Sequence, residues 1–501
     1  MTHLRGEDIT REHDCRVDVA IVGSGPAGST VAHDLTRRGL RVAVIEAGPW
    51  REPGDFPLDT FESMGRDYRD MGASVTVGSA PIPYVQAKLV GGASPINGAI
   101  CWRMPRDVYD EWVARDRRLA EGLPWEAIEA HTDAIEALLD VRDTAAEVRG
   151  RKAELMALGA DALGLRHRPI RRNVTGCEGL GRCMQGCPKG RKNSVDRALL
   201  QPAIERGALL ISSMEVAEVL VERGRAVGLR GKAAGGGRVT VRADRAVVLA
   251  ASAVQTPALL LSNGLRGGPV GEHFQCHPGV SAAGRFREPV RMWEGATQGH
   301  EVTGLRHEGL KFETLGFGLG LLASRLPGTG RAFADRVAEM AHWLDWGVAV
   351  RAEAEGRVRV LGGRTVVFYS PTPRDIARFR RGVRVMGDMF FAAGAETVDA
   401  GVRGFSHDLR SPLELAPIER GGPTSAAAFT AAITHMFGTC RMGSDAEASV
   451  VGTDFAHHRI ARLYIADSSV FPSNLGVNPQ VSIMALAAIA AARVAGEGPR
   501  A

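Results

Sequence analysis

The stretch that decides the fold is VDVAIVGSGPAGSTVAHDL, residues 17–35, near the start of a 501-residue chain. An apolar, β-branched run over 17–22 passes into Gly23, Gly25 and Gly28, and helical spacing follows. The order predicts a strand, a glycine turn and a helix. The first glycine permits the tight turn, the second lets a pyrophosphate approach the backbone, and the third lets helix and strand pack closely.

A second predicted strand, 41–45, ends at Glu46, about 20 residues beyond the glycines, which is the usual distance in such units. A carboxylate at this place accepts hydrogen bonds from ribose hydroxyls, whereas an arginine favours a 2′-phosphate. The stretch therefore predicts a dinucleotide site. These residues alone leave FAD and NAD both open.

Composition and charge exclude several other classes of protein. The chain has 45% hydrophobic residues, 62 basic and 57 acidic residues, and no basic run interleaved with aromatics, so no nucleic-acid partner is expected. The longest apolar run, 481–492, is too short to span a bilayer, and the first 18 residues lack the features of a secretory signal. Seven cysteines without an export signal favour reduced thiols and a cytoplasmic protein.

A second glycine-rich segment, LVGGASPINGAICWRMP at 89–105, shows neither helical nor alternating spacing and alone would be a plain surface loop. Together with the dinucleotide turn it resembles the glucose-methanol-choline (GMC) oxidoreductases, in which such a segment runs beside the isoalloxazine ring of FAD. The resemblance favours FAD over NAD. Several members bind flavin covalently through a histidine just before the Asn97 position, and Ile96 stands there, which implies non-covalent FAD.

The resemblance covers nearly the whole chain and implies its fold. We expect an α/β protein, α+β overall, with a Rossmann-like FAD-binding domain and a substrate domain whose mostly antiparallel sheet is flanked by helices. The implied FAD-binding domain has three parts, 15–105, 166–287 and 429–497. A helical excursion or cap spans 106–165, and a substrate-binding domain spans 288–428.

Some local elements follow from the residues themselves. Two strands bracket LGGR at 357–361 and 365–369, and the apolar spacing over 371–395 predicts a helix. Ser252 stands where the family usually has glycine, which puts the local turn geometry in question.

The C-terminal region carries the strongest resemblance, in HMFGTCRMG at 435–443 and RLYIADSSVFPSNLGVNPQVSIMALAAIAAARVA at 462–495. We expect a short buried strand ending at Asp467, then an apolar helix with Asn478 as its cap and Pro479 at its first position. The N-terminus of this helix suits the negative charge that develops on a reduced flavin.

In the family, the residues matching His435 and Asn478 face the flavin across the substrate carbon. Neutral imidazole is suited to take a hydroxyl proton, so we expect His435 to be the general base, with Asn478 holding the hydroxyl oxygen. The predicted function is oxidation of a CH–OH group by hydride transfer to flavin N5, on a sugar, glycoside or polyol-like alcohol. A sterol or long-chain alcohol is the alternative substrate.

Two other classes of function remain open. A non-redox relative, such as a hydroxynitrile lyase or a photodecarboxylase, keeps FAD without net alcohol oxidation, and a binding protein could keep a vestigial FAD. Oxygen, a quinone or a redox protein would each serve as electron acceptor for an oxidoreductase with this sequence.

The resemblance also implies which residues bind FAD. The backbone near Val216 meets the adenine, Asp467 supports the ribityl or pyrophosphate part, and His277 is a packed structural histidine. The full expected set is Gly23, Ser24, Gly25, Ala27, Gly28, Glu46, Ala47, Gly92, Ser94, Asn97, Gly98, Val216, Asp467, Asn478 and Pro479.

A cysteine-rich segment, GCEGLGRCMQGCPKGRKNS at 176–194, places Cys177, Cys183 and Cys187 close together. The CxxC pairs common at zinc sites are absent, and no fourth ligand is evident nearby. Some GMC dehydrogenases carry an iron–sulfur cluster in this region, so a cluster remains an alternative. We favour a structural loop or a disulfide and expect no metal.

Overall fold

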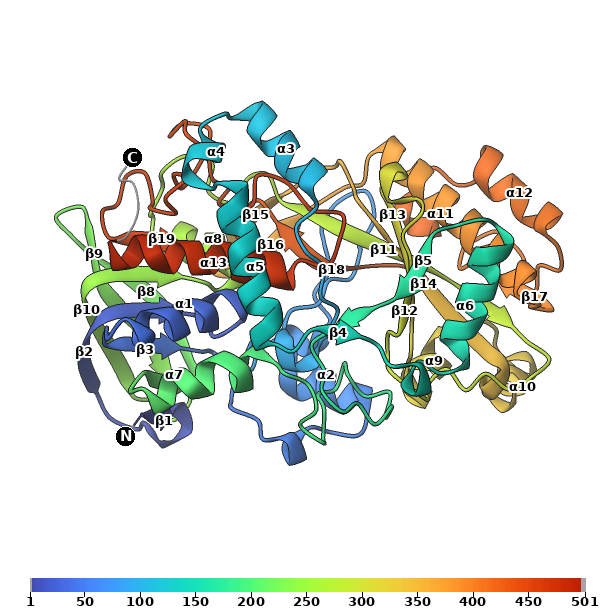
Figure 1. Ribbon diagram of the computed structural model, residues 1–501, viewed down its shortest axis with the longest axis horizontal. Coiled ribbons are helices and arrows are strands. Elements are labelled where there is room, and N and C mark those ends of the chain that lie inside the picture. Colours follow the sequence, from blue (N-terminus) through green and yellow to red (C-terminus); the bar gives the residue numbers. More distant parts are fainter. Residues whose placement is uncertain (1, 497–501) are drawn as a thin grey trace.

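The computed structural model describes residues 2–496 and arranges them around two β-sheets (Figure 1). The strand, glycine turn and helix predicted from residues 17–35 are confirmed as β2 (His13–Val22) and α1 (Pro26–Arg37), with β3 (Val42–Ile45) after them. Gly23 has a φ of +92°, and a Cβ on Gly28 would lie 1.9 Å from the carbonyl oxygen of Gly23. Both positions therefore require glycine.

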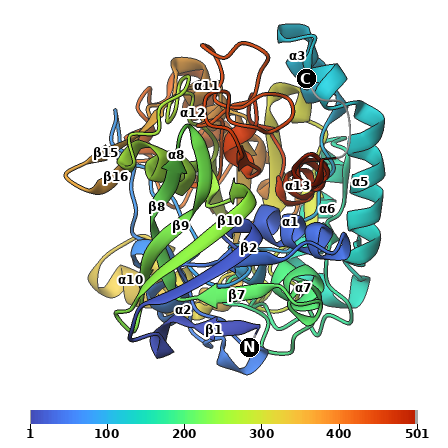
Figure 2. The same ribbon diagram turned by 90° about the vertical axis from the view of Figure 1, so that its left-hand side faces the viewer.

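The first sheet has the order β1-β7-β3-β2-β10-β9-β8, with β19 beside β10 (Figure 2). Its strands are parallel from β1 to β10 and at β19, and β10, β9 and β8 form an antiparallel meander. The remaining bounds are β1 (His3–Arg5), β7 (Leu209–Ser212), β8 (Met214–Glu222), β9 (Arg225–Ala233), β10 (Arg238–Leu249) and β19 (Leu463–Ile465).

Helix α13 (Gln480–Ala495) packs against both α1 and α5 (Trp125–Leu138), so residues from the two ends of the chain share one core. Most of its side chains are buried, as expected of a helix that is apolar all round. The predicted cap was wrong. Pro479 is the residue before the helix, and Asn478 makes no capping bond because its amide oxygen accepts a hydrogen bond from Lys311.

The second sheet is antiparallel throughout, with the order β17-β11-β14-β13-β12-β5 and with β18 beside β11. Helix α11 (Pro373–Ala392) packs on it, with α6 (Arg151–Ala162) and α12 (Pro412–Gly421) against α11. The strands are β5 (His167–Pro169), β11 (Gln275–Arg285), β12 (His300–Val302), β13 (Leu310–Thr314), β14 (Trp343–Val350), β17 (Thr397–Asp399) and β18 (Ala431–Phe437). The expected fold class is confirmed.

Three strands of this second sheet come from segments that we expected in the FAD-binding domain. They are β5, β11 and β18. As a result, strands of the first sheet and strands of the second sheet alternate along the chain. The domain boundaries therefore stay a proposal, with these strands assigned to the substrate side.

Local predictions in the substrate part are confirmed. Strands β15 (Arg357–Leu361) and β16 (Arg364–Phe368) form a hairpin, and α11 buries its apolar row. Ser252, at the start of α8 (Ser252–Ser262), has a φ of +94°, a conformation that glycine adopts more easily. The other elements are α2 (Thr60–Asp67), α3 (Arg106–Arg115), α4 (Leu119–Gly122), α7 (Gln201–Glu205), α9 (Leu319–Arg325), α10 (Gly330–Ala338), β4 (Arg142–Asp143) and β6 (Arg171–Arg172).

Candidate active site

The two glycine-rich segments meet in space. The backbone N–H of Gly91 donates to Oγ of Ser24 at 3.0 Å, and a Cβ on Gly92 would lie 2.7 Å from Cα of Gly25. A side chain at position 92 would therefore fill the space beside the glycine turn at residues 23–28. The bare backbone at the start of α1 suits a pyrophosphate, because free N–H groups and the positive end of the helix dipole favour anions.

Glu46 follows β3, as predicted, and both of its carboxylate oxygens are hydrogen-bonded within the turn region. Oε2 accepts from the backbone and the hydroxyl of Ser24 at 3.0 and 2.8 Å, and Oε1 accepts from the backbone of Gly48 at 2.9 Å. The carboxylate is thus held in a fixed orientation at the mouth of the glycine turn. Carboxylate oxygens have spare lone pairs, so ribose hydroxyls can bind as well.

The second segment contains a single helical turn, Ser94–Ile96, and then reaches the start of α13. Nδ2 of Asn97 donates to Oε1 of Gln480 at 2.7 Å, and a Cβ on Gly98 would lie 1.9 Å from Oε1 of Gln298. Ile96 is buried in an apolar cluster with Phe56 and Leu89. Ile96 offers no atom that could bond covalently to a flavin.

The other predicted cofactor residues lie on the first sheet and its helices, as their positions in the chain require. Ala27 is in the first turn of α1, and Val216 lies at a bulge of β8. The carboxylate of Asp467 follows β19 and accepts from the backbones of Ser252 and Ser469, at 3.0 and 2.8 Å. Burial raises the pKa of Asp467. In this arrangement Asp467 joins β19 to α8.

His435 lies on β18 at a bulge in its pairing with β11. Cys276 is opposite Met436 and Pro278 is opposite Ile433, so β18 carries one extra residue beside His277. Bulges re-aim side chains. Nδ1 of His435 lies 3.3 Å from Nδ1 of His277, and Nε2 of His435 has no hydrogen-bond partner among residues 2–496.

His277 is more than a packing residue. The backbone N–H of Gly476 donates to its Nε2 at 2.8 Å, so neutral His277 carries its own proton on Nδ1, toward His435. His277 thereby joins β18 to the turn that precedes Asn478. Its segment was recognised in the sequence, but the pairing across β11 and β18 depends on a bulge that no local pattern indicates.

Both imidazoles are neutral in this environment. Burial, followed by the positive charge of Lys311, lowers the pKa of His435 to about 4. Burial and the neighbouring His435 hold the pKa of His277 well below its usual value. At neutral pH, His435 is therefore uncharged, but while Nδ1 accepts from the N–H of His277 its own proton is on Nε2. It can act as a base at Nε2 only in the other tautomer, with its proton on Nδ1.

Sequence reasoning missed the charged cluster beside Asn478. Lys311 and Glu313 on β13, with Glu301 on β12, form a buried group whose ammonium donates to Oδ1 of Asn478 at 2.8 Å. The alternating order LKFET is typical of a strand with one solvated face, so it did not indicate a buried site.

The cysteine-rich segment forms a small cavity lined by Cys177, Cys183 and Cys187. All seven cysteines are free thiols, so the disulfide alternative was wrong. Within residues 2–496 no group of three His, Cys, Asp or Glu side chains has an arrangement that could hold a metal ion. Sγ of Cys183 instead accepts from the guanidinium of Arg172 at 2.9 Å.

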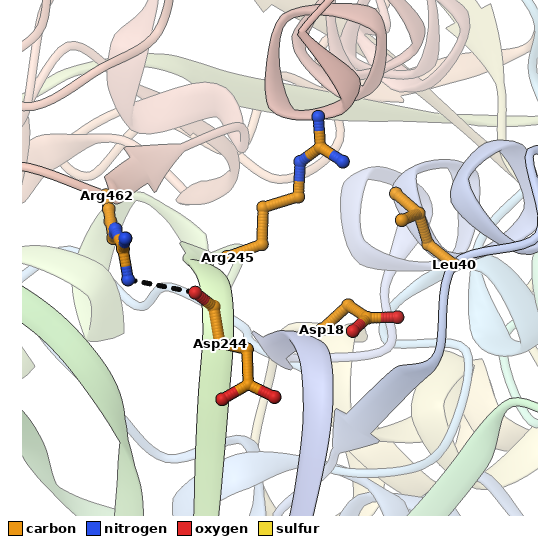
Figure 3. A pocket seen from close by; sticks show the side chains of 5 residues that line it. All are labelled: Asp18, Leu40, Asp244, Arg245 and Arg462. Carbon is orange, nitrogen blue, oxygen red and sulfur yellow. Dashed lines mark hydrogen bonds between the residues drawn. The ribbon is translucent and has the colours of Figure 1, made fainter.

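A charged hollow on the first sheet lies apart from these residues (Figure 3). Arg462 donates to the carbonyl oxygen of Asp244 at 2.9 Å, and Arg245 donates to the carbonyl oxygen of Val494 at the end of α13. Asp18 pairs with Arg41 at 2.6 Å. The charged groups at this hollow therefore bind one another and the C-terminal end of α13. None of the predicted site residues lines the hollow.

A Rossmann-like half with a glycine cradle is joined to a sheet that carries a partly buried histidine, an arrangement that fits an FAD-dependent oxidoreductase. A model of FAD-dependent oxidoreductases matches residues 18–54. Models of GMC oxidoreductases match residues 61–279 and 353–487. The chain belongs to the GMC oxidoreductase family, and no helix within residues 2–496 is long and apolar enough to cross a membrane.

Three relatives show the range of the family. An uncharacterised GMC-type oxidoreductase of Mycobacterium tuberculosis is 34% identical, over 94% of this chain and 75% of the relative. A long-chain-alcohol oxidase of Arabidopsis thaliana is 26% identical over 98% and 68%, and a paromamine 6′-oxidase of Streptomyces fradiae is 27% identical over 99% and 94%. The solved pyridoxine 4-oxidase is similar in fold, with a TM-score of 0.70 and 20% identity over 96% of this chain and all of that one.

Proposed function

We propose that this enzyme oxidises an alcohol to a carbonyl compound, with the hydroxyl oxygen held between His435 and Asn478. One observation carries the proposal: Nε2 of His435 has no protein partner within residues 2–496, while the amide of Asn478 is held by Lys311, whose charge also acts on His435. FAD, when bound, supplies the hydride acceptor at flavin N5.

His435 takes the hydroxyl proton as the hydride leaves the same carbon. Its pKa of about 4 keeps the ring neutral at neutral pH, and burial and Lys311 disfavour its keeping a second proton. To accept at Nε2, the ring must carry its own proton on Nδ1, so the contact with the N–H of His277 has to open. The proton therefore passes on to solvent after the reaction. Activity should fall as the pH drops through about 4, because the protonated ring cannot act as a base.

For the cofactor we propose non-covalent FAD bound by the expected residues of the two glycine segments, Glu46, Val216 and Asp467. The support is the close approach of Gly25 and Gly92, which keeps side chains away from the turn. The buried position of Ile96 supports the absence of a covalent link at that residue.

For the substrate we propose a sugar, glycoside or polyol-like alcohol. The paromamine 6′-oxidase relative, which matches along nearly its whole length, supports this class. A long-chain alcohol is the second candidate, supported by the Arabidopsis relative.

The test is to add alcohols of both classes to the purified enzyme without air and follow the visible flavin absorbance. Bleaching by one class identifies the substrate class, and the rate of recovery in air shows whether oxygen is the acceptor. A flavin that no alcohol bleaches would favour a non-redox relative instead.

His435→Ala should slow bleaching by about 10²–10⁴-fold, the usual contribution of a positioned base. His307→Ala is the matched control, because that side chain is 72% exposed. Equal rates in His435→Ala and the native enzyme would remove His435 from the mechanism.

A further inference from the structure

Lys311 is a charged side chain with 1% of its surface exposed, at the junction of the two halves of the molecule. It lies on β13 between Leu310 and Phe312, which pack into the core of the second sheet. Successive side chains of a strand point to opposite faces, so Lys311 and Glu313 point the other way, toward the start of α13. Lys311 reaches Asn478 there, at 2.8 Å.

The ammonium group of Lys311 stays charged although it is buried. Burial lowers the pKa of Lys311, but the carboxylates of Glu301 and Glu313 outweigh burial and raise it above its usual value. Glu301 lies 2.9 Å away, and Glu313 is in direct hydrogen-bond contact.

The two carboxylates are themselves fixed. Glu301 accepts from the indole N–H of Trp102 at 2.8 Å and pairs with Arg168 at 2.8 Å. Glu313 accepts from Nε2 of Gln298 at 2.6 Å. Gln298 in turn lies against Gly98 of the second glycine segment. The position of Lys311 is therefore determined by groups on both sides of the site.

This arrangement orients the amide of Asn478. A lysine ammonium has only donors, so Asn478 must present its oxygen to it. The two hydrogens on Nδ2 then point away from Lys311 and remain available to an oxygen in the site. Without the lysine, the amide could turn over and present an acceptor to a hydroxyl that must lose its own proton.

We propose that Lys311 is a positioning residue for the alcohol oxidation, holding Asn478 as a donor to the substrate oxygen. This inference rests on the proposed function. The fixed donor stabilises the negative charge that develops on the oxygen as its proton leaves, and the nearby ammonium adds to this effect.

The experiment is a double-mutant cycle between positions 311 and 478, read as kcat/KM with the alcohol that bleaches the flavin. Lys311→Met alone leaves two buried carboxylates without their cation and can fail to fold. The main variant is therefore Lys311→Met with Glu313→Gln, which removes one charge of each sign. It is compared in the native and the Asn478→Ala backgrounds, with flavin content and thermal unfolding measured for each.

We expect the Lys311→Met/Glu313→Gln variant to lose about 10–100-fold in kcat/KM, as misplacement of a reacting group does. In the Asn478→Ala background the same change should cost less than about threefold, because its target is gone. The acid limb of the pH profile should move to higher pH, since the charge that lowers the pKa of His435 is lost.

Lys152→Met is the matched control. Lys152 is also 1% exposed, but within residues 2–496 it donates only to the carbonyl oxygens of Met292 and Glu294, so kcat/KM should stay within about twofold.

Three results would each have a distinct meaning. An equal loss in both backgrounds, or no loss at all, would show that Lys311 does not act through Asn478 and would overturn the inference. Asn478→Ala that keeps full activity would overturn the proposed role of Asn478, and the Lys311 inference with it. An unmoved pH profile would show that its charge does not reach His435.

Discussion

Two groups of buried cations in this molecule differ in the groups that compensate their positive charge. Beside Asn478, Lys311 is balanced by two carboxylates, and its pKa is raised. In and around the cysteine-rich segment, Lys152, Arg172 and Lys192 form no ion pair with a carboxylate within residues 2–496 and bind mainly backbone carbonyls. The first group keeps a fixed charge, whereas the two lysines of the second group have charges that depend on pH.

The pKa values of the second group show this difference. Burial lowers the pKa of Lys152 to about 7 and that of Lys192 to about 8. Burial alone would raise the pKa of the Cys183 thiol, but Arg172 and Lys192 outweigh it and lower the pKa to about 6. A thiolate therefore takes the place of the missing carboxylate. The comparison teaches that the partner, more than burial, decides whether a buried cation keeps its charge.

The largest expected effect is on stability, when the carboxylate group loses a member. Glu301→Leu leaves Lys311 with one carboxylate partner, and we expect a loss of about 3–5 kcal/mol in the free energy of unfolding, measured by denaturant titration. Arg168→Gln is the control, because that arginine is 44% exposed and should matter by less than about 1 kcal/mol. Equal losses in the two variants would contradict the idea that burial makes the Lys311 group special.

The thiolate provides the next test. Alkylation of Cys183 by iodoacetamide should follow a pH profile with a midpoint of about 6, identified by its absence in Cys183→Ser. Arg172→Met should move that midpoint up by about 2 units, toward the ordinary value of a thiol. A midpoint that stays near 6 without Arg172 would show that Lys192 alone holds the thiolate.

The smallest effect is the dependence of stability on pH. The folded-state pKa values of Lys152 and Lys192 lie below the unfolded value of 10.5, so the unfolded chain binds more protons from about pH 7 upward. Stability should therefore rise between pH 7 and 9, and Lys152→Met should remove about 1–2 kcal/mol of that rise in denaturant titrations.

Lys311 contributes nothing to this rise, because its pKa is raised and its stabilising charge is lost only above pH 10.5. The Lys311→Met/Glu313→Gln variant should keep the native slope. A flattened slope in that variant would break the contrast between the two groups.

Local sequence predicted the parts of the fold that depend on neighbours in the chain. The glycines at 23, 25 and 28 predicted the β2–α1 turn, and the apolar spacing predicted α11. Ser252 stands where the family usually has glycine, which drew attention to this turn, and Ser252 has a positive φ in the structure. Such features were readable because each is fixed by the conformations of a few consecutive residues.

The candidate site was readable only in part. His435 and Asn478 were indicated by resemblance, whereas Lys311, Glu301 and His277 owe their roles to strands that pair across long distances. An alternating strand looks the same whether its polar face meets water or another domain. The cap assigned to Asn478 was wrong for the same reason, because a cation from the other sheet occupies the amide oxygen.

The interleaving of the two sheets also bears on how the chain folds. Strand β18 completes the second sheet, β19 lies beside β10 in the first, and α13 packs on α1, so late segments supply parts of both halves. Contacts between such distant segments slow folding. An unfinished chain on the ribosome therefore holds both cores incomplete, and the proposed site at His435 and Asn478 is assembled only when synthesis has passed α13.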